Sequence, residues 1–394
     1  MQADPVVHFD DTAVAFSYKS DSELKKAHLI FSLVNHPMIS AVATRLAKAS
    51  LNLKLPVKGL IRSTVFEHFC GGENIDQSEK TIQNLFKFKI GTILDYSIEG
   101  EETEEGFDKT AEEIISTIVK AKNNPATPFC VFKVTGIGLF DLLEKIQAKA
   151  NLTEAEKSAW ARVENRVDRI CRKSFECGVP VLVDAEDSWI QNPIDELAYA
   201  MMRKYNREKP IVLNTFQMYR VDMLDNLKNA YAEALKMNYF LGAKLVRGAY
   251  MEKEAARAQA MNYPNPIRPN KEATDKAFNA GLEFCVEHAD RIKLMCGSHN
   301  EYSNQYLASL IAKKGIKSND PNIWFAQLLG MSDNISFNLA KAGYNVAKYV
   351  PYGPVESVMP YLLRRAAENT SVAGQSSREL LLIRRELRRR RNGK

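Results

Sequence analysis

Two adjacent arginines near the end of the chain have the types and spacing for binding an acid group. They lie in the segment YLLRRAAEN, in which Tyr361 is four positions before Arg365 and Arg364 is four positions before Glu368. On an α-helix, residues three or four apart lie on neighbouring parts of one surface. A guanidinium group binds a carboxylate through a planar fork of N–H donors. The segment therefore predicts a carboxylate clamp, although a solvated helix face with ion pairs would give the same pattern.

Polar residues also follow eight short apolar runs, and these are the second set of candidate chemical groups. They are Asp95, Lys133, Asp184, Gln217, Arg247, the group Ser298, His299 and Asn300, then Gln327 and Tyr349. Each one alone is typical of any strand end. Together, so many titratable and hydrogen-bonding groups indicate an enzyme site that holds a polar ligand.

The elements that must position these groups are strands alternating with helices. The runs are IGTILDYSI, FCVFKVTG, VPVLVDAE, PIVLNTFQ, AKLVRGAY, IKLMCGSHN, NIWFAQLLG and VAKYVPYG. The sequence predicts both ends of one helix between them. Thr153 and Glu156 form a T-x-x-E capping box at its start, and Gly178 follows its end. The alternation predicts a parallel sheet, and eight repeats favour a closed α/β barrel, the (βα)8 TIM-like fold. In that fold the active site lies at the carboxyl ends of the strands.

The chain before and after the barrel lacks the alternation of strand and helix patterns. Residues 20–88 repeat apolar positions every three or four residues and show no strand pattern, which predicts a helical arm. We therefore divide the chain into an N-terminal helical arm at 1–88, a barrel at 89–375 and a basic amphipathic C-terminal tail at 376–394.

The tail holds eight basic and two acidic residues, which accounts for the whole net charge of +6. A helix over the tail would gather its apolar residues on one stripe and arginines on another. The apolar stripe is Leu380, Ile383 and Leu387, and the basic stripe is Arg384, Arg388 and Arg391. This layout is typical of a helix that lies in the headgroup region of a membrane, and an ordinary docked helix would share it.

Composition narrows the class of protein. The chain has 394 residues, of which 45% are hydrophobic and 26% charged, as is usual for a folded protein. Its six cysteines form no C-x-x-C pair, from which we expect a reducing compartment and no metal site. The N-terminus resembles neither a signal peptide nor a transit peptide, and no run of about 18 apolar residues occurs. We expect a cytoplasmic protein, with the tail as its candidate contact to the inner face of the membrane.

Over residues 69–370 the sequence resembles the proline dehydrogenase family. The collinear motifs are FCGGE, TILDYSIEG, VFKVTGIG, VDAE, NTFQMY, KLVRGAY, SHN, QLLGM and YLLRRAAEN, with Tyr349 before the last. KLVRGAY together with Y-x14-RR-x2-E is highly specific. The resemblance implies a distorted barrel that binds FAD non-covalently and oxidises L-proline to Δ1-pyrroline-5-carboxylate by hydride transfer from C5 to flavin N5. It also implies a membrane quinone as electron acceptor, a place as first step of proline catabolism to glutamate, and pyrroline-5-carboxylate dehydrogenase as a candidate partner.

The resemblance assigns roles residue by residue. Lys133, Arg364 and Arg365 would hold the substrate carboxylate, and Tyr250, Leu328 and Tyr349 would form walls around the proline ring. The implied flavin contacts are Asp184, Ala185, Gln217, Lys244, Val246, Arg247, Gly248, Ala249, Ser298, His299 and Glu368. Asp184 and Lys244 are the predicted catalytic residues. Two positions depart from the family, since many bacterial members have Arg in place of Lys244 and the motif at Ser298 often begins with Thr.

Three other functions fit parts of the sequence. A nicotinamide dehydrogenase would use the glycines Gly136 and Gly138 after a strand, but Asp141 stands where the third glycine of that fingerprint should fall. Another FAD barrel, such as a folate reductase, would not explain the paired arginines with Tyr349. Nucleic-acid binding would rest on RRELRRRR alone, so we expect no nucleic-acid partner.

The acidic segment DYSIEGEETEEGFD, residues 95–108, is a candidate lid over the site. Its carboxylates, Glu99 above all, could pair with Arg364 or Arg365 when substrate binds, a gating role common for barrel loops. A merely solvated loop would have the same composition.

Overall fold

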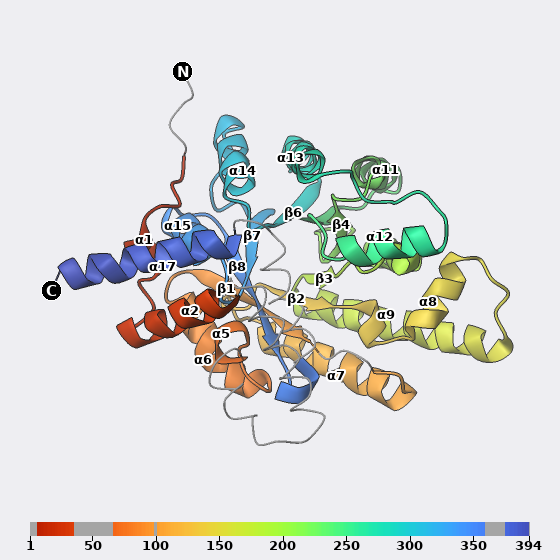
Figure 1. The fold of residues 1–394 in the computed structure, drawn as a ribbon. Coiled ribbons are helices and arrows are strands. Elements are labelled where there is room, and N and C mark those ends of the chain that lie inside the picture. The colour runs from red at the N-terminus through yellow and green to blue at the C-terminus, as the bar shows by residue number, and fades with distance from the viewer. Residues whose placement is uncertain (1–5, 35–65, 98–100, 359–374, 394) are drawn as a thin grey trace. The chain divides into compact units, whose positions relative to one another are not determined.

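The computed structural model describes residues 6–34, 66–97, 101–358 and 375–393. Eight parallel strands form a closed barrel in the order β1 to β8 (Figure 1). They are β1 Ile90–Tyr96, β2 Phe129–Phe132, β3 Val181–Val183, β4 Val212–Gln217, β5 Leu241–Val246, β6 Ile292–Gly297, β7 Ile323–Leu328 and β8 Val346–Tyr352. The predicted α/β barrel and its eight strands are confirmed. We describe the chain as two compact units, the central unit within Gly100–Ala326 and the terminal unit made of Val7–Glu99 and Gln327–Lys394.

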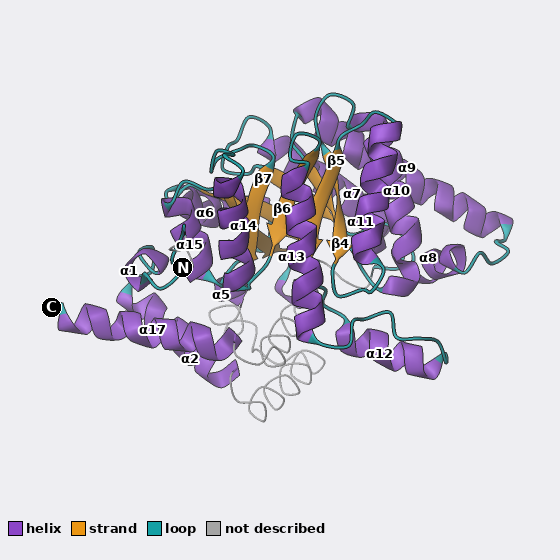
Figure 2. Cartoon of the chain, turned by 90° about the horizontal axis from the view of Figure 1, so that it is seen from above, coloured by secondary structure: helices purple, strands orange, loops and turns teal. Residues whose placement is uncertain are grey.

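The central unit alternates its strands with helices. The helices are α7 Glu104–Ala121, η2 Val134–Gly136, α8 Phe140–Gln147, α9 Glu154–Cys177, η3 Ser188–Ile190, α10 Gln191–Tyr205, α11 Met223–Lys236, α12 Met251–Ala260, α13 Lys271–Glu287 and α14 Glu301–Lys313. Helices α11 and α13 pack on the outer side of the sheet around β4 and β5 (Figure 2). Every residue of β4 is buried, as expected for a parallel strand that is covered on both faces.

Helix α9 begins and ends where the sequence predicts. The Thr153 hydroxyl accepts a hydrogen bond from the Glu156 backbone N–H, and the Glu156 carboxylate accepts one from the Thr153 backbone N–H, which completes the capping box. Gly178 follows the helix in the left-handed conformation, with φ 69°. Glycine adopts this conformation without the steric cost that a side chain would bring.

The candidate lid is partly helical. Glu104, Glu105 and Asp108 lie in the first turns of α7, which Thr103 caps by accepting the Gly106 backbone N–H. The buried Arg166 of α9 pairs with Glu104 at 2.5 Å and with Asp108 at 2.7 Å. The Glu104 and Asp108 carboxylates are thus bound to α9 in this structure. Glu99 lies outside the described residues, and the lid hypothesis stays a prediction.

The terminal unit joins the two ends of the chain. It contains α1 Thr12–Ala15, α2 Asp21–Val34, α5 Glu67–Phe69, α6 Ile75–Phe86, α15 Asp333–Lys341 and α17 Gln375–Asn392, together with β1 and β8. Strand β1 pairs with β8 in parallel from Ile90 opposite Val346 to Tyr96 opposite Tyr352. The division into arm, barrel and tail stays a prediction.

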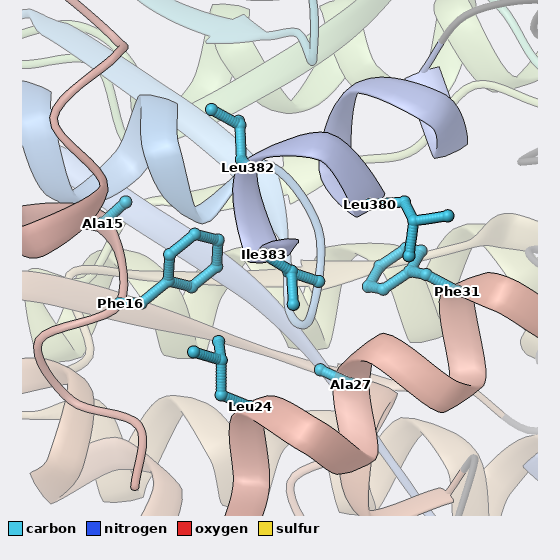
Figure 3. Close-up of a cluster of buried hydrophobic side chains, with 8 residues drawn as sticks. All are labelled: Ala15, Phe16, Leu24, Ala27, Phe31, Leu380, Leu382 and Ile383. Carbon is cyan, nitrogen blue, oxygen red and sulfur yellow. The ribbon is translucent and has the colours of Figure 1, made fainter. Parts of the chain in front are cut away.

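The tail forms helix α17, but its apolar stripe is buried within the protein. Leu380, Leu382 and Ile383 pack with Ala15 of α1, with the following Phe16, and with Leu24, Ala27 and Phe31 of α2 (Figure 3). Leu387 also packs against this cluster. The membrane hypothesis is therefore wrong about this stripe, which is not available to lipid. Among the described helices, none is long and apolar enough to cross a bilayer.

Buried charge fixes the same helix. Glu386 is fully buried and binds Arg389 and Arg390, each at 2.8 Å. The Arg390 guanidinium also donates to the backbone oxygens of Phe16 and Lys19, both at 2.8 Å. Arg384, Arg388 and Arg391 are exposed, although the Arg384 Nε still donates a hydrogen bond to His28 Nε2 of α2 at 3.2 Å.

Candidate active site

Three charged side chains meet near the carboxyl ends of β2, β3 and β5 in the central unit. Lys133 follows β2, Asp184 follows β3, and Lys244 is the fourth residue of β5. The Lys244 Nζ lies 2.5 Å from Asp184 Oδ1, and the Lys133 Nζ lies 3.4 Å from Asp184 Oδ2. These three residues, here called the strand-end cluster, come from positions up to 111 apart in sequence, the distance from 133 to 244. The barrel topology brings them together.

Electrostatics keep the strand-end cluster charged. Burial alone would raise the pKa of the Asp184 carboxyl, but the Lys244 and Lys133 ammonium groups outweigh burial and hold this pKa below its ordinary value. Asp184 is therefore ionised at neutral pH. Two lysines against one carboxylate leave one net positive charge, which suits a ligand that carries a carboxylate.

Arg247 directly follows β5, and each nitrogen of its guanidinium donates a hydrogen bond. Nε donates to Asp275 at 2.7 Å, and the two terminal nitrogens donate to the hydroxyls of Ser298 and Ser303 at 2.8 and 2.9 Å. The guanidinium also lies over the Phe278 ring, 4.3 Å from the ring centre. Arg247 and Ser298, both predicted flavin contacts, are thus joined in one rigid group. His299 follows Ser298 in the turn that leads into α14.

Gln217 gives the test of whether the site suits a bound cofactor. It ends β4 and is 2% exposed, and its side-chain oxygen has no hydrogen-bond partner among the described residues. A buried acceptor left without a donor costs about 1–3 kcal/mol. A bound group with an N–H donor, such as the isoalloxazine ring of a flavin, would remove that cost. The residue therefore fits the predicted role.

Gly248 has a reason to be glycine that the sequence did not reveal. Its φ is 130°, and a Cβ at this position would lie 2.4 Å from the Tyr219 ring. A close approach to Tyr219 therefore excludes every other residue, whereas a close approach to the cofactor stays a prediction. Its neighbours Val246, Ala249 and Tyr250 occupy the end of β5 and the turn into α12.

Ala185 follows Asp184 in the turn after β3, and the other predicted residues belong to the terminal unit. Leu328 ends β7, and the next backbone N–H, of Leu329, donates to the Tyr349 carbonyl at 2.8 Å. Tyr349 is the fourth residue of β8 and is 7% exposed, so the prediction that it ends its strand is wrong. The strand continues because Pro351 and Tyr352 still pair with β1. Arg364, Arg365 and Glu368 lie outside the described residues.

Three further residues of the site region were missed from the sequence. Asp275, in α13, pairs locally with Lys271, but no local signal connects it with Arg247, which is 28 positions away. Glu186 is buried and binds Thr135 through two hydrogen bonds. Glu186 stands two positions after Asp184 and Thr135 two positions after Lys133, and this equal spacing was the available signal.

Comparison with known proteins gives the class. A barrel with a charged cluster at the strand ends is the architecture of (βα)8 enzymes. The family model described as proline dehydrogenase matches residues 78–378. Mitochondrial proline dehydrogenase 1 of Dictyostelium discoideum is 36% identical, covering 96% of this chain and 74% of that protein. The carbapenem antibiotics biosynthesis protein CarD of Pectobacterium carotovorum is 34% identical, covering 84% and 86%. The chain therefore belongs to the proline dehydrogenase family and is an oxidoreductase.

A solved structure supports the fold. Proline utilization A from Bdellovibrio bacteriovorus, inactivated by N-propargylglycine, superposes with a TM-score of 0.70 at 20% identity. The match covers 91% of this chain but only 38% of that one, so this chain spans well under half of that protein. At this identity the likeness is evidence for the fold alone. The resemblance to the family is confirmed, while the roles of the individual site residues stay predictions.

Proposed function

We propose that this chain oxidises L-proline to Δ1-pyrroline-5-carboxylate with FAD as its bound cofactor. Family membership supports the reaction, and the observation that carries the proposal is the strand-end cluster, with one net positive charge. Proline has one carboxylate to bind and one C–N bond to oxidise. The cluster supplies the cation for the first, at the edge of the barrel where enzymes of this fold act.

The side chains contribute orientation and charge. Lys133, with Arg364 and Arg365 by resemblance, would bind the carboxylate and so fix the direction of C5. The same cations would favour the neutral form of the proline amine, which must lose its proton before C5 is oxidised. Asp184 holds both lysines in place. When bound, FAD supplies the acceptor for the hydride at its N5.

Residues at the ends of β4, β5 and β6 would hold the cofactor. Gln217 offers a buried acceptor, and Arg247 offers a cation beside Ser298 and His299. Lys244, which Asp184 binds, would supply a second cation to the flavin. A positive environment stabilises negative charge that develops on a reduced cofactor.

We further propose a membrane quinone as the electron acceptor, with the enzyme at the cytoplasmic face of the inner membrane and pyrroline-5-carboxylate dehydrogenase as the consumer of the product. Since the leucine stripe of α17 is buried, the exposed arginines of that helix are the remaining candidate membrane contact. Each basic residue near an anionic bilayer contributes about 1 kcal/mol.

Anaerobic addition of L-proline to the purified protein tests the function. We expect a yellow protein whose visible flavin absorbance is lost with L-proline and is retained with D-proline or with NADH. A yellow protein that L-proline leaves unreduced would disprove the proposed substrate. A colourless protein that reduces NAD with proline would instead support a nicotinamide dehydrogenase.

A further inference from the structure

A second pair of side chains runs alongside the strand-end cluster. Thr135 lies two positions after Lys133, in the short turn η2, and Glu186 lies two positions after Asp184. One oxygen of Glu186 accepts the Thr135 backbone N–H at 3.1 Å, and the other accepts the Thr135 hydroxyl at 2.5 Å. The turns after β2 and β3 are therefore joined twice, by the pair Lys133 with Asp184 and by the pair Thr135 with Glu186.

Glu186 is itself anchored in the protein interior. It is 6% exposed, and its backbone N–H donates to the Gln191 side-chain oxygen at 2.7 Å. The Gln191 amide donates to Asp195 at 2.8 Å, and Asn214 of β4 donates to the same Asp195 oxygen at 2.7 Å. A chain of buried hydrogen bonds thus connects the turn after β2 to helix α10 and strand β4. Buried hydrogen bonds of this kind restrict the motion of the turn.

The two lysines of the cluster differ in how their backbones are held. Lys244 lies within β5, paired with Thr215 of β4 on one side and Met295 of β6 on the other. Lys133 lies beyond the end of β2, its ammonium is farther from Asp184, and its side chain is the most exposed of the three. A lysine side chain is long and has considerable rotamer entropy. Its placement therefore depends on the turn that carries it.

We propose that Glu186 is a positioning residue, which holds the turn after β2 through Thr135 so that Lys133 reaches both Asp184 and the substrate carboxylate. This inference rests on the proposed function, since it assigns Lys133 a bound carboxylate. Glu186 need not touch substrate. Removal of its contact with Thr135 should weaken carboxylate binding and leave the later chemical step largely unchanged.

Substitutions at Thr135 test the contact with little risk to folding. Thr135→Val removes the hydroxyl donor at nearly constant volume, and Thr135→Ser restores it. We expect Thr135→Val to raise KM for L-proline about tenfold with kcat lowered less than twofold, and Thr135→Ser to stay within twofold of wild type on both. Glu186→Ala should raise KM at least as much. Flavin content and melting temperature, measured for each variant, show that the fold is kept.

A double-mutant cycle asks whether the effect passes through Lys133. The dissociation constant of cyclopentanecarboxylate, which has the ring and the acid group of proline but no amine, is measured by calorimetry for wild type, Lys133→Met, Thr135→Val and the double variant. We expect Thr135→Val to weaken binding about tenfold in the wild-type background and less than twofold in the Lys133→Met background.

The outcomes separate this inference from the proposed function. If L-proline fails to reduce the wild-type flavin, the proposed function is wrong. If L-proline reduces it, but Thr135→Val and Glu186→Ala leave KM within twofold of wild type, the positioning role is wrong. An equal loss of cyclopentanecarboxylate binding in both backgrounds would also overturn it, since Thr135 would then act independently of Lys133.

Discussion

At the scale of single residues, the site depends on one carboxylate that binds two lysines. Asp184 binds Lys244 and Lys133 at the ends of three strands, and removal of either lysine changes the charge offered to a ligand. Lys244 is the more buried of the two, with a side chain 6% exposed, so its loss would leave the Asp184 carboxylate dependent on the more distant ammonium of Lys133. Lys133 is the better residue for a test of function.

Lys133→Met should raise KM for L-proline strongly while flavin remains bound, because the variant loses a charge-assisted contact to the carboxylate. Removal of one partner of such a pair costs about 2–5 kcal/mol, which corresponds to roughly thirtyfold or more. Steady-state kinetics with L-proline measure the change. Lys145→Met is the matched control, since Lys145 makes a half-exposed pair with Glu156 and should have little effect. A change below threefold at Lys133 would mean that the carboxylate binds elsewhere.

At the scale of elements, helix α17 is a structural part of the terminal unit. Its buried leucines pack against α2 and the residues around α1, and its Glu379 accepts the backbone N–H of Ser332 in the turn after β7. That turn follows Leu328, a predicted wall of the proline ring. Helix α17 therefore supports the chain directly after a predicted substrate residue.

Leu382→Ala should destabilise the protein by about 2–5 kcal/mol, because Leu382 is fully buried and its truncation leaves a cavity. Leu381→Ala is the matched control on the same helix, since Leu381 is 57% exposed and should change the free energy of unfolding by about 0.5 kcal/mol or less. Urea unfolding measures both variants. Equal effects of the two substitutions would contradict the docking of α17.

Glu379 should make stability depend on pH. Burial, followed by the charge of Asp333, raises the pKa of the Glu379 carboxyl to about 7 in the folded protein, against an ordinary value of 4.5. Its contribution to stability is then complete below pH 4.5 and is lost as pH rises through about 7. Glu379→Gln keeps an acceptor for Ser332 but cannot ionise.

We therefore expect Glu379→Gln to lose less stability than wild type between pH 5 and pH 8, by on the order of 1–3 kcal/mol. Denaturant unfolding at the two pH values measures the difference. Glu105→Gln, at an exposed position of α7, should behave as wild type does. An unchanged pH dependence in Glu379→Gln would mean that Glu379 is already ionised at pH 5 in the folded protein.

At the scale of the whole molecule, the tail has an apolar side that is buried and a basic side that is exposed. One side completes a hydrophobic cluster with the start of the chain, so deletion of residues 376–394 would remove part of a core as well as a basic surface. A loss of membrane binding after that deletion would not show whether the lost core or the lost basic surface was responsible. Substitution of the exposed arginines changes the basic surface and leaves the core intact.

The variant with Arg384, Arg388 and Arg391 all changed to Gln should keep the melting temperature of wild type and lose binding to anionic liposomes. Three basic residues contribute about 3 kcal/mol, or roughly 100-fold in affinity. Co-sedimentation with phosphatidylserine vesicles measures binding, and neutral vesicles are the control. Retention of full binding by the variant would remove α17 from the membrane contact.

Local signals in the sequence determined much of the fold. The eight strands were found because short β-branched runs between longer helical stretches are a local pattern, and α9 was bounded because its cap residues act within four positions. The candidate residues Lys133, Asp184, Gln217 and Arg247 were found for the same reason, as polar groups that follow those runs. Tyr349 was misplaced within its strand, since pairing with β1 decided where β8 ends.

Only the tertiary structure decided which of these groups meet and what they face. The pairing of Asp184 with two lysines and of Glu186 with Thr135 joins residues 51 to 60 positions apart, and the order of strands around the barrel creates those contacts. The amphipathic pattern of the tail fits a lipid surface and a protein surface equally, because both bury a leucine stripe. Burial against α1 and α2 decided between them, since removal of apolar side chains from water needs a partner that no local pattern specifies.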